Sequence, residues 1–200
     1  MTNVPLMFQP LFKYAEFNGR SRRSEFWLWV LFRILLGMVM GAGALAWLGP
    51  VMPHLKDHPE LFMPRYFTVW PTLSLVNLAL LIPSLAVGVR RLHDINRSGW
   101  WIIMPFVVAF VGVTIFMIVF GTHIFQAAMA HQNGSEMTES EGLSLVFGMF
   151  GYLFLCVILP SLISQIVMLV FYVTDGTPGP NRFGNDPKGR GTKSVVDTFA

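Results

Sequence analysis

Residues 66–89 read YFTVWPTLSLVNLALLIPSLAVGV, an unbroken stretch without a charged side chain. A membrane-spanning helix needs about 20 mostly apolar residues, so this stretch is long enough to cross a bilayer. Three more stretches are similar: residues 26–49 contain one charge, Arg33, and residues 100–121 and 142–174 contain none. The sequence therefore predicts four transmembrane helices, at about 26–49, 69–89, 100–121 and 147–173.

The composition supports a single all-α membrane domain over residues 1–200. Hydrophobic residues make up 54% of the 200-residue chain and charged residues 12%, about half the charged fraction of a typical soluble protein. This balance excludes a disordered chain and an ordinary cytosolic enzyme. The single cysteine, Cys156, excludes a disulfide framework and a cysteine-based metal cluster. We expect no cofactor.

The basic residues are distributed unevenly between the two sides of the predicted membrane domain. One side carries eleven: Lys13, Arg20, Arg22, Arg23, Arg90, Arg91, Arg97, Arg182, Lys188, Arg190 and Lys193. The other side carries Lys56 and Arg65, and its second loop is acidic, with Glu136, Glu139 and Glu141. Because lysine and arginine gather in cytoplasmic loops, we expect both termini in the cytoplasm. Each such cation is worth about 1 kcal/mol against anionic lipid, which favours a lipid partner over nucleic acid.

Both ends of the chain are expected to lie on that side. Residues 1–25 form the N-terminal part, in which Phe8, Leu11, Phe12 and Ala15 share one helical face. This spacing predicts a short amphipathic helix in the membrane interface, which Pro10 would interrupt. Residues 174–200 are expected to form a cytoplasmic tail.

Few polar residues lie within the predicted spans. Arg33 is about 10 Å inside the first span at 1.5 Å per residue, so it either extends back to the interface or has a buried functional partner. Gly37 and Gly41 form a small-xxx-small pair that allows close approach of another helix. Asn77 and Gln165 are candidates for an interhelical hydrogen bond.

Acidic residues and lysines are missing from all four spans, which argues against an ion-coupled transporter. The fourth apolar run is too long for one straight crossing, so it tilts, kinks at Pro160 or begins outside the bilayer. In the first outer loop, His54 and His58 have a spacing that can hold a metal on a helix. Neighbouring prolines make a regular helix unfavourable there, and we predict no metal site.

Three polar motifs fall on the predicted cytoplasmic side: FNGRSRRSEFW at 17–27, RRLHDINRSGWW at 90–101 and GTPGPNRFGNDP at 176–187. Glu25 suits the positive end of the first span, and Asn96 suits a left-handed turn. Opposite charges in these motifs predict ion pairs across this face. Three interpretations remain open: a cap that locks the helices together, an anion-binding site and a catalytic site. The candidate ligand- or partner-binding residues are Arg20, Arg23, Arg90, Arg91, His93, Asp94, Arg97, Asn181, Arg182 and Asp186.

With these motifs the chain resembles the bacterial inner-membrane family known as domain of unknown function 805, which includes the YhaH-like proteins. The family pattern has a GR-xx-R-xx-FW segment, an RRLHD-x-G-x-SGWW hairpin and an NRFG-x-DP segment. This chain matches them at 19–27, 90–101 and 181–187, with Asn96 where glycine is usual. The resemblance implies a small polytopic protein of the bacterial inner membrane and implies no known activity.

Three functions are compatible with the sequence. The favoured one is a non-enzymatic membrane protein with no catalytic residues, whose arginine-rich face binds an anionic lipid headgroup or another membrane protein. The alternatives are a small transporter or channel component, through Arg33, Asn77 and Gln165, and a lipid-acting enzyme that uses His93 and Asp94. Four helices of this size also leave enough lipid-facing surface for a homo-oligomer.

Overall fold

The structure, a computed structural model, describes residues 4–132 and 138–190. Glu136 of the acidic loop and Lys193 of the tail lie outside these residues. The described residues form helices and turns, with no strand beyond one isolated bridge between Asn181 and Gly184. The elements are α1 (Gln9–Phe12), α2 (Arg23–Leu48), η1 (Gly49–His54), η2 (Pro59–Leu61), α3 (Phe62–Asp94), η3 (Gly99–Ile103), α4 (Met104–Gln132), α5 (Glu139–Leu153), η4 (Phe154–Ile158) and α6 (Leu159–Val173).

Four helical segments of the described chain are long and apolar enough to cross a membrane: Arg23–His54, Phe62–Asp94, Gly99–Gln132 and Glu139–Val173. Each contains one of the predicted spans, so the all-α fold with four spans is confirmed. Many large apolar side chains on these helices are exposed, as lipid-facing side chains are; Phe110, for example, is 73% exposed. The chain forms two compact units, one of residues 1–99 with 174–200 and the other of residues 100–173.

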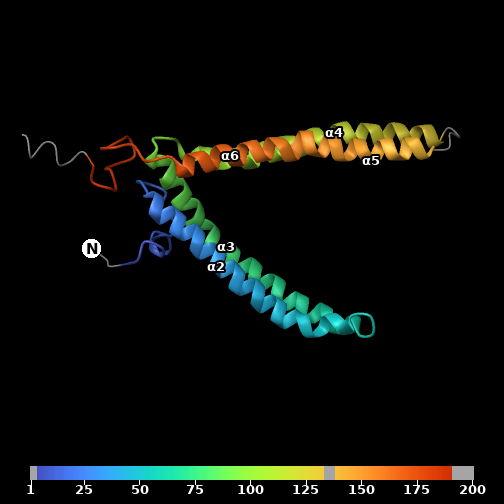
Figure 1. The fold of residues 1–200 in the computed structure, drawn as a ribbon, viewed down its shortest axis with the longest axis horizontal. Coiled ribbons are helices and arrows are strands. Elements are labelled where there is room, and N and C mark those ends of the chain that lie inside the picture. The colour runs from blue at the N-terminus through green and yellow to red at the C-terminus, as the bar shows by residue number, and fades with distance from the viewer. Residues whose placement is uncertain (1–3, 133–137, 191–200) are drawn as a thin grey trace, which may run out of the picture. The chain divides into compact units, whose positions relative to one another are not determined.

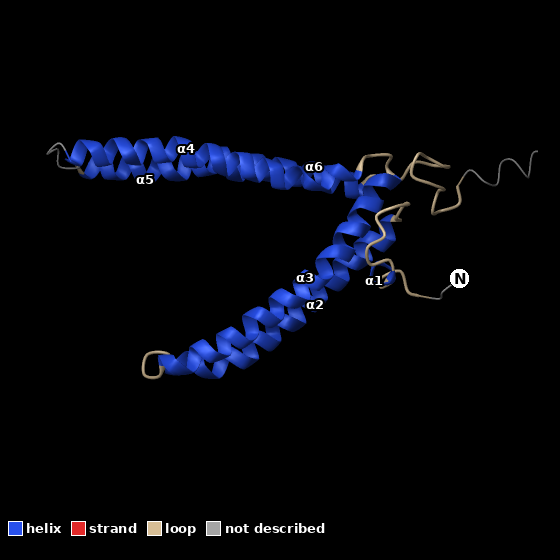
Figure 2. Ribbon diagram, turned by 180° about the vertical axis from the view of Figure 1, so that it is seen from behind, coloured by secondary structure: helices blue, strands red, loops and turns tan. Residues whose placement is uncertain are grey.

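In the first unit, α2 and α3 run side by side and antiparallel, connected through η1 and η2 (Figure 1). Trp29 donates a hydrogen bond to Ser84, and Arg33 donates one to Asn77. The short helix α1 lies against the same pair (Figure 2), where Phe8 meets the ring of Phe32 edge-on. Proline is tolerated in the first turn of a helix, and Pro10 begins α1 rather than interrupting it.

In the second unit, α4 packs along the continuous helix made by α5, η4 and α6. The η4 segment is a π-helical turn that ends just before Pro160. Proline lacks the N–H that would donate to the carbonyl four residues earlier, here that of Cys156. Prolines and single π-turns are both sites where the regular hydrogen bonding of a helix is interrupted, and here the two lie together. The long apolar run is therefore one helix with a local irregularity beside Pro160.

Candidate functional site

Asp94, the last residue of α3, is at the centre of a buried polar cluster. Its Oδ1 accepts a hydrogen bond of 2.9 Å from Nε of Arg20, and its Oδ2 lies 2.5 Å from Nη1 of Arg91. The side chains of Asp94, Arg20 and Arg91 are at most 2% exposed. Because a buried carboxylate needs charged or hydrogen-bonding partners, this arrangement holds the N-terminal segment against the end of α3.

A second buried ion pair joins the start of α2 to α3. Nη2 of Arg90 lies 3.1 Å from a carboxylate oxygen of Glu25, and both side chains are nearly inaccessible to solvent. The other terminal nitrogen of Arg90 donates to the carbonyl of Glu16 at 2.9 Å. The amide of Ser21 donates to the Arg90 carbonyl at 3.1 Å. Arg90 thus fixes the path of the chain that leads into α2.

The C-terminal segment is attached to the same place by main-chain contacts. The amide of Thr177 donates to the Asp94 carbonyl at 2.9 Å, and Asn181 donates to the carbonyl of His93 at 2.9 Å. Arg91 also donates to the carbonyl of Thr174. A side chain at Gly176 could not fit, since its Cβ would lie 2.0 Å from Oδ2 of Asp94. Only glycine allows the backbone to approach Asp94 this closely.

Asp186 closes the cluster on the C-terminal side. Its carboxylate accepts hydrogen bonds from Nε of Arg190 at 2.8 Å and from the amide of Lys188 at 2.9 Å. Burial alone would raise the pKa of Asp186, but the bonds from Arg190 and Lys188 and the charges of Arg190 and Arg20 outweigh it and hold this pKa at about 2. Asp186 therefore remains ionised throughout the neutral pH range.

His93 is enclosed by the C-terminal segment. Its ring stacks on that of Phe183 with 3.8 Å between centroids, and its Nδ1 lies 3.1 Å from the carbonyl of Gly19. The guanidinium carbon of Arg182 lies over the Phe183 ring, 4.7 Å from its centroid. Arg182 also donates a hydrogen bond to the carbonyl of Asn96. Asn96 has a φ of 58°, which confirms the predicted left-handed turn.

The buried charges of this cluster balance. Among the described residues, the buried cations are Arg20, Arg90 and Arg91 and the buried anions are Glu25, Asp94 and Asp186. We call these six residues the clamp. The cations around it are exposed or half-exposed, and we call them the basic rim: Lys13, Arg22, Arg23, Arg97, Arg182, Lys188 and Arg190, the last of which bonds to Asp186. The rim is accompanied by the exposed acids Glu16 and Asp175, and Asp175 lies 3.1 Å from Arg23 and 2.9 Å from Lys188.

The predicted site residues are therefore divided between two layers. Arg20, Arg90, Arg91, His93, Asp94, Asn181 and Asp186 are brought together inside, whereas Arg23, Arg97 and Arg182 lie outside. Binding of a ligand by these residues stays a prediction. Sequence reasoning did not pair Glu25 with Arg90, and it did not single out Gly176 or Arg190. The sequence around Gly176 contains no signal that the carboxylate of Asp94 would lie against this glycine.

The pattern of the three motifs agrees with a match to a family model, "protein of unknown function (DUF805)", over residues 14–185. The chain belongs to the DUF805 family. Inner membrane protein YhaI of Escherichia coli is 28% identical to it over 175 residues, which are 88% of each chain. Inner membrane protein YhaH of the same organism is 24% identical over 88% of this chain and 89% of YhaH. No solved structure matches. This DUF805 protein is thus a polytopic member of a bacterial inner-membrane family.

Proposed function

We propose that this protein is a non-enzymatic inner-membrane protein whose basic rim binds the headgroups of anionic phospholipids. The observation that carries the proposal is the separation of charge: the clamp is neutral as a whole, so the surplus positive charge of this end lies on the rim. Cations next to a membrane helix attract anionic lipid at about 1 kcal/mol each. Trp27, exposed at the start of α2, is a residue type that favours headgroup depth.

The contacts of His93 and Asp94 favour binding over catalysis. A general acid or base must come within hydrogen-bonding reach of its substrate. Asp94 is 1% exposed and is shared between two arginines. His93 is 8% exposed, lies beneath Phe183 and has one ring nitrogen next to a main-chain carbonyl. Both side chains are therefore held in contacts within the protein and are almost inaccessible to a substrate, which supports a non-enzymatic role.

The test replaces three rim arginines and leaves the clamp intact. The triple variant Arg22→Gln/Arg97→Gln/Arg182→Gln, taken from nanodiscs of phosphatidylethanolamine and phosphatidylglycerol, should retain less phosphatidylglycerol in native mass spectra. At about 1 kcal/mol for each cation, affinity should fall roughly fivefold for each arginine removed. The matched triple lysine variant keeps the charges and should retain lipid like the wild type. Equal retention by the glutamine variant would overturn the proposal.

We further propose that both termini lie in the cytoplasm. Lysine and arginine are enriched in the cytoplasmic segments of membrane proteins, and the segments next to both termini carry most of the basic residues of this chain. An alkaline phosphatase fused after Arg190 should then be inactive in cells, since this enzyme needs the periplasm to form its disulfides. The same fusion in the loop between α4 and α5 should be active. Activity of the terminal fusion would reverse the proposed orientation.

A further inference from the structure

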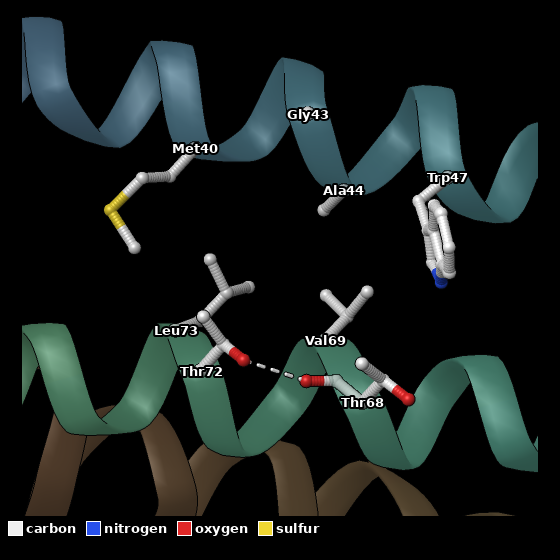
Figure 3. Close-up of a pocket in the computed structure, with 8 residues that line it drawn as sticks. All are labelled: Met40, Gly43, Ala44, Trp47, Thr68, Val69, Thr72 and Leu73. Atoms are coloured by element: carbon white, nitrogen blue, oxygen red, sulfur yellow. Dashed lines mark hydrogen bonds between the residues drawn. The ribbon is translucent and has the colours of Figure 1, made fainter.

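Two adjoining cavities lie between α2 and α3, the larger in the half of this hairpin away from the clamp and the smaller near its middle. The larger has a volume of about 360 Å³ and is lined on one side by Met40, Gly43, Ala44 and Trp47. Val69 and Leu73 of α3 face them (Figure 3). The smaller cavity, of about 160 Å³, shares Met40 and Leu73 with the larger one and extends to Arg33. We call the two together the α2–α3 groove.

The groove exists because α2 has glycines along the face that lines it, so no side chain of α2 fills the space at these positions. A Cβ built at Gly37, Gly41 or Gly43 would meet nothing within 4 Å. The expected close approach of a helix at Gly37 and Gly41 is therefore not made by the described residues. Space that no side chain fills forfeits packing contacts, so an occupant of the right shape would be favourable there.

The walls of the larger cavity are apolar even where they contain threonines. The hydroxyl of Thr72 donates to the carbonyl of Thr68 at 2.8 Å (Figure 3). The hydroxyl of Thr68 donates to the carbonyl of Pro64, also at 2.8 Å. Such bonds to the preceding turn satisfy the hydroxyl within its own helix. The groove therefore offers no hydroxyl that lacks a partner, and its surface suits a hydrocarbon chain.

Arg33 supplies a charge at one end of this apolar groove. Its Nη2 donates to Oδ1 of Asn77 at 3.0 Å, so the side chain has a partner on α3 rather than extending alone to the interface. Its Nη1 is buried and has no hydrogen-bond partner among the described residues. A buried guanidinium nitrogen without a partner is costly, and a guanidinium binds carboxylate or phosphate oxygens well.

We propose that the α2–α3 groove binds one acyl chain of an anionic membrane lipid whose acidic headgroup pairs with Arg33. From Arg33 to Trp47 the groove runs about 21 Å along α2 at 1.5 Å per residue. The hydrocarbon of one leaflet is about 15 Å thick, half of a 30 Å core. Because Arg33 lies about 10 Å inside the first span, a chain whose headgroup reaches it from the leaflet nearest the clamp would continue past the midplane toward Trp47. This site is separate from the basic rim and does not depend on it.

The charge of Arg33 favours a lipid over a second copy of the chain. Residues 26–49, 66–89, 100–121 and 142–174 contain no Asp or Glu. A helix of a second copy in the groove would therefore bring no carboxylate to the depth of Arg33. An anionic lipid brings both the apolar chain and the counter-charge.

The test uses phosphatidylglycerol with a photoreactive acyl chain, incorporated in nanodiscs with the full-length protein. Irradiation should label peptides that contain residues 40–47 and 68–73. The variant Arg33→Gln should reduce this labelling on the order of tenfold, as expected for one charge-assisted hydrogen bond. Gly43→Leu should also reduce it, because the new side chain would occupy the cavity. Gly121→Leu is the matched control, since a Cβ at Gly121 also meets nothing within 4 Å but lies on α4.

Each other outcome overturns the proposal. Equal labelling by the zwitterionic phosphatidylcholine probe would show that no acidic headgroup is recognised. Loss of labelling in Arg65→Gln but not in Arg33→Gln would place the headgroup at the opposite end of the hairpin. Labelling confined to other helices, with cross-links between copies at Gly43, would assign the groove to a second copy. The triple glutamine variant of the rim should leave groove labelling unchanged, which separates this proposal from the previous one.

Discussion

Replacing Asp94 with Asn is expected to lower the free energy of unfolding by about 3–5 kcal/mol, the usual cost of leaving a buried charge without its partner. Asparagine has nearly the same size, so the change removes charge and little else. Arg20 and Arg91, whose side chains are 1% and 0% exposed, would lose the carboxylate that they share. Tryptophan fluorescence during denaturant titration in detergent measures the loss. Trypsin cleavage after Arg182 and Lys188 should also become faster, because the C-terminal segment would be held less firmly.

Two further variants separate the clamp from ordinary surface charge. Asp175 is 56% exposed and pairs with Arg23 and Lys188, so Asp175→Asn should cost less than about 1 kcal/mol. Combining Asp94→Asn with Arg91→Met removes one of the two guanidinium groups that lose the Asp94 carboxylate and should recover part of the lost stability. An Asp94→Asn protein with the unfolding midpoint of the wild type would show that the clamp does not hold these segments together.

The helices could be predicted from sequence because each depends on a property of one continuous segment. Residues 66–89 are apolar and uncharged, and this alone requires a helix in a membrane, where backbone groups must bond internally. The turn at Asn96 is equally local. The helix α4 continues to Gln132, beyond the membrane span predicted at residues 100–121. Hydropathy marks the most apolar part of a helix, and its signal is weaker over residues 122–132, where histidines and glutamines interrupt the apolar side chains.

The contacts of the site could be predicted only as a group. Opposite charges in three motifs indicated ion pairs, but the choice of Arg90 for Glu25 and of Arg20 with Arg91 for Asp94 depends on how three distant segments meet. Arg33 illustrates the same point: its position in the sequence allowed either extension to the interface, which was favoured, or a buried functional partner. In the structure, Oδ1 of Asn77 on α3 lies 3.0 Å from Nη2 of Arg33. Pairing is a property of the tertiary structure and leaves little trace in one sequence.

Replacing Gly112 with Ala is expected to destabilise the second unit by about 1–3 kcal/mol, as overpacking does. A Cβ at this position would lie 2.1 Å from the carbonyl oxygen of Cys156 and 3.3 Å from Cα of Val157. These are backbone atoms, so no side chain can turn aside, and α4 would have to move away from the π-turn. Thermal unfolding followed by circular dichroism in detergent measures the change. Gly121→Ala on the same helix meets nothing within 4 Å and should be neutral or stabilising by up to about 1 kcal/mol.

The obstacle to Gly112→Ala is the carbonyl to which Pro160 cannot donate a hydrogen bond. If the π-turn exists because Pro160 lacks an N–H, the variant Pro160→Ala would supply an N–H that can donate to the carbonyl of Cys156 in a regular α-helix. This bond would turn the carbonyl away from α4 and toward the direction of its own helix axis. The double variant Gly112→Ala/Pro160→Ala should then lose less stability than the sum of the two single changes. Neighbouring residues that share a backbone distortion typically show coupling of about 0.5–3 kcal/mol. Strict additivity would mean that the close approach at Gly112 arises from the packing of α4 and not from the proline.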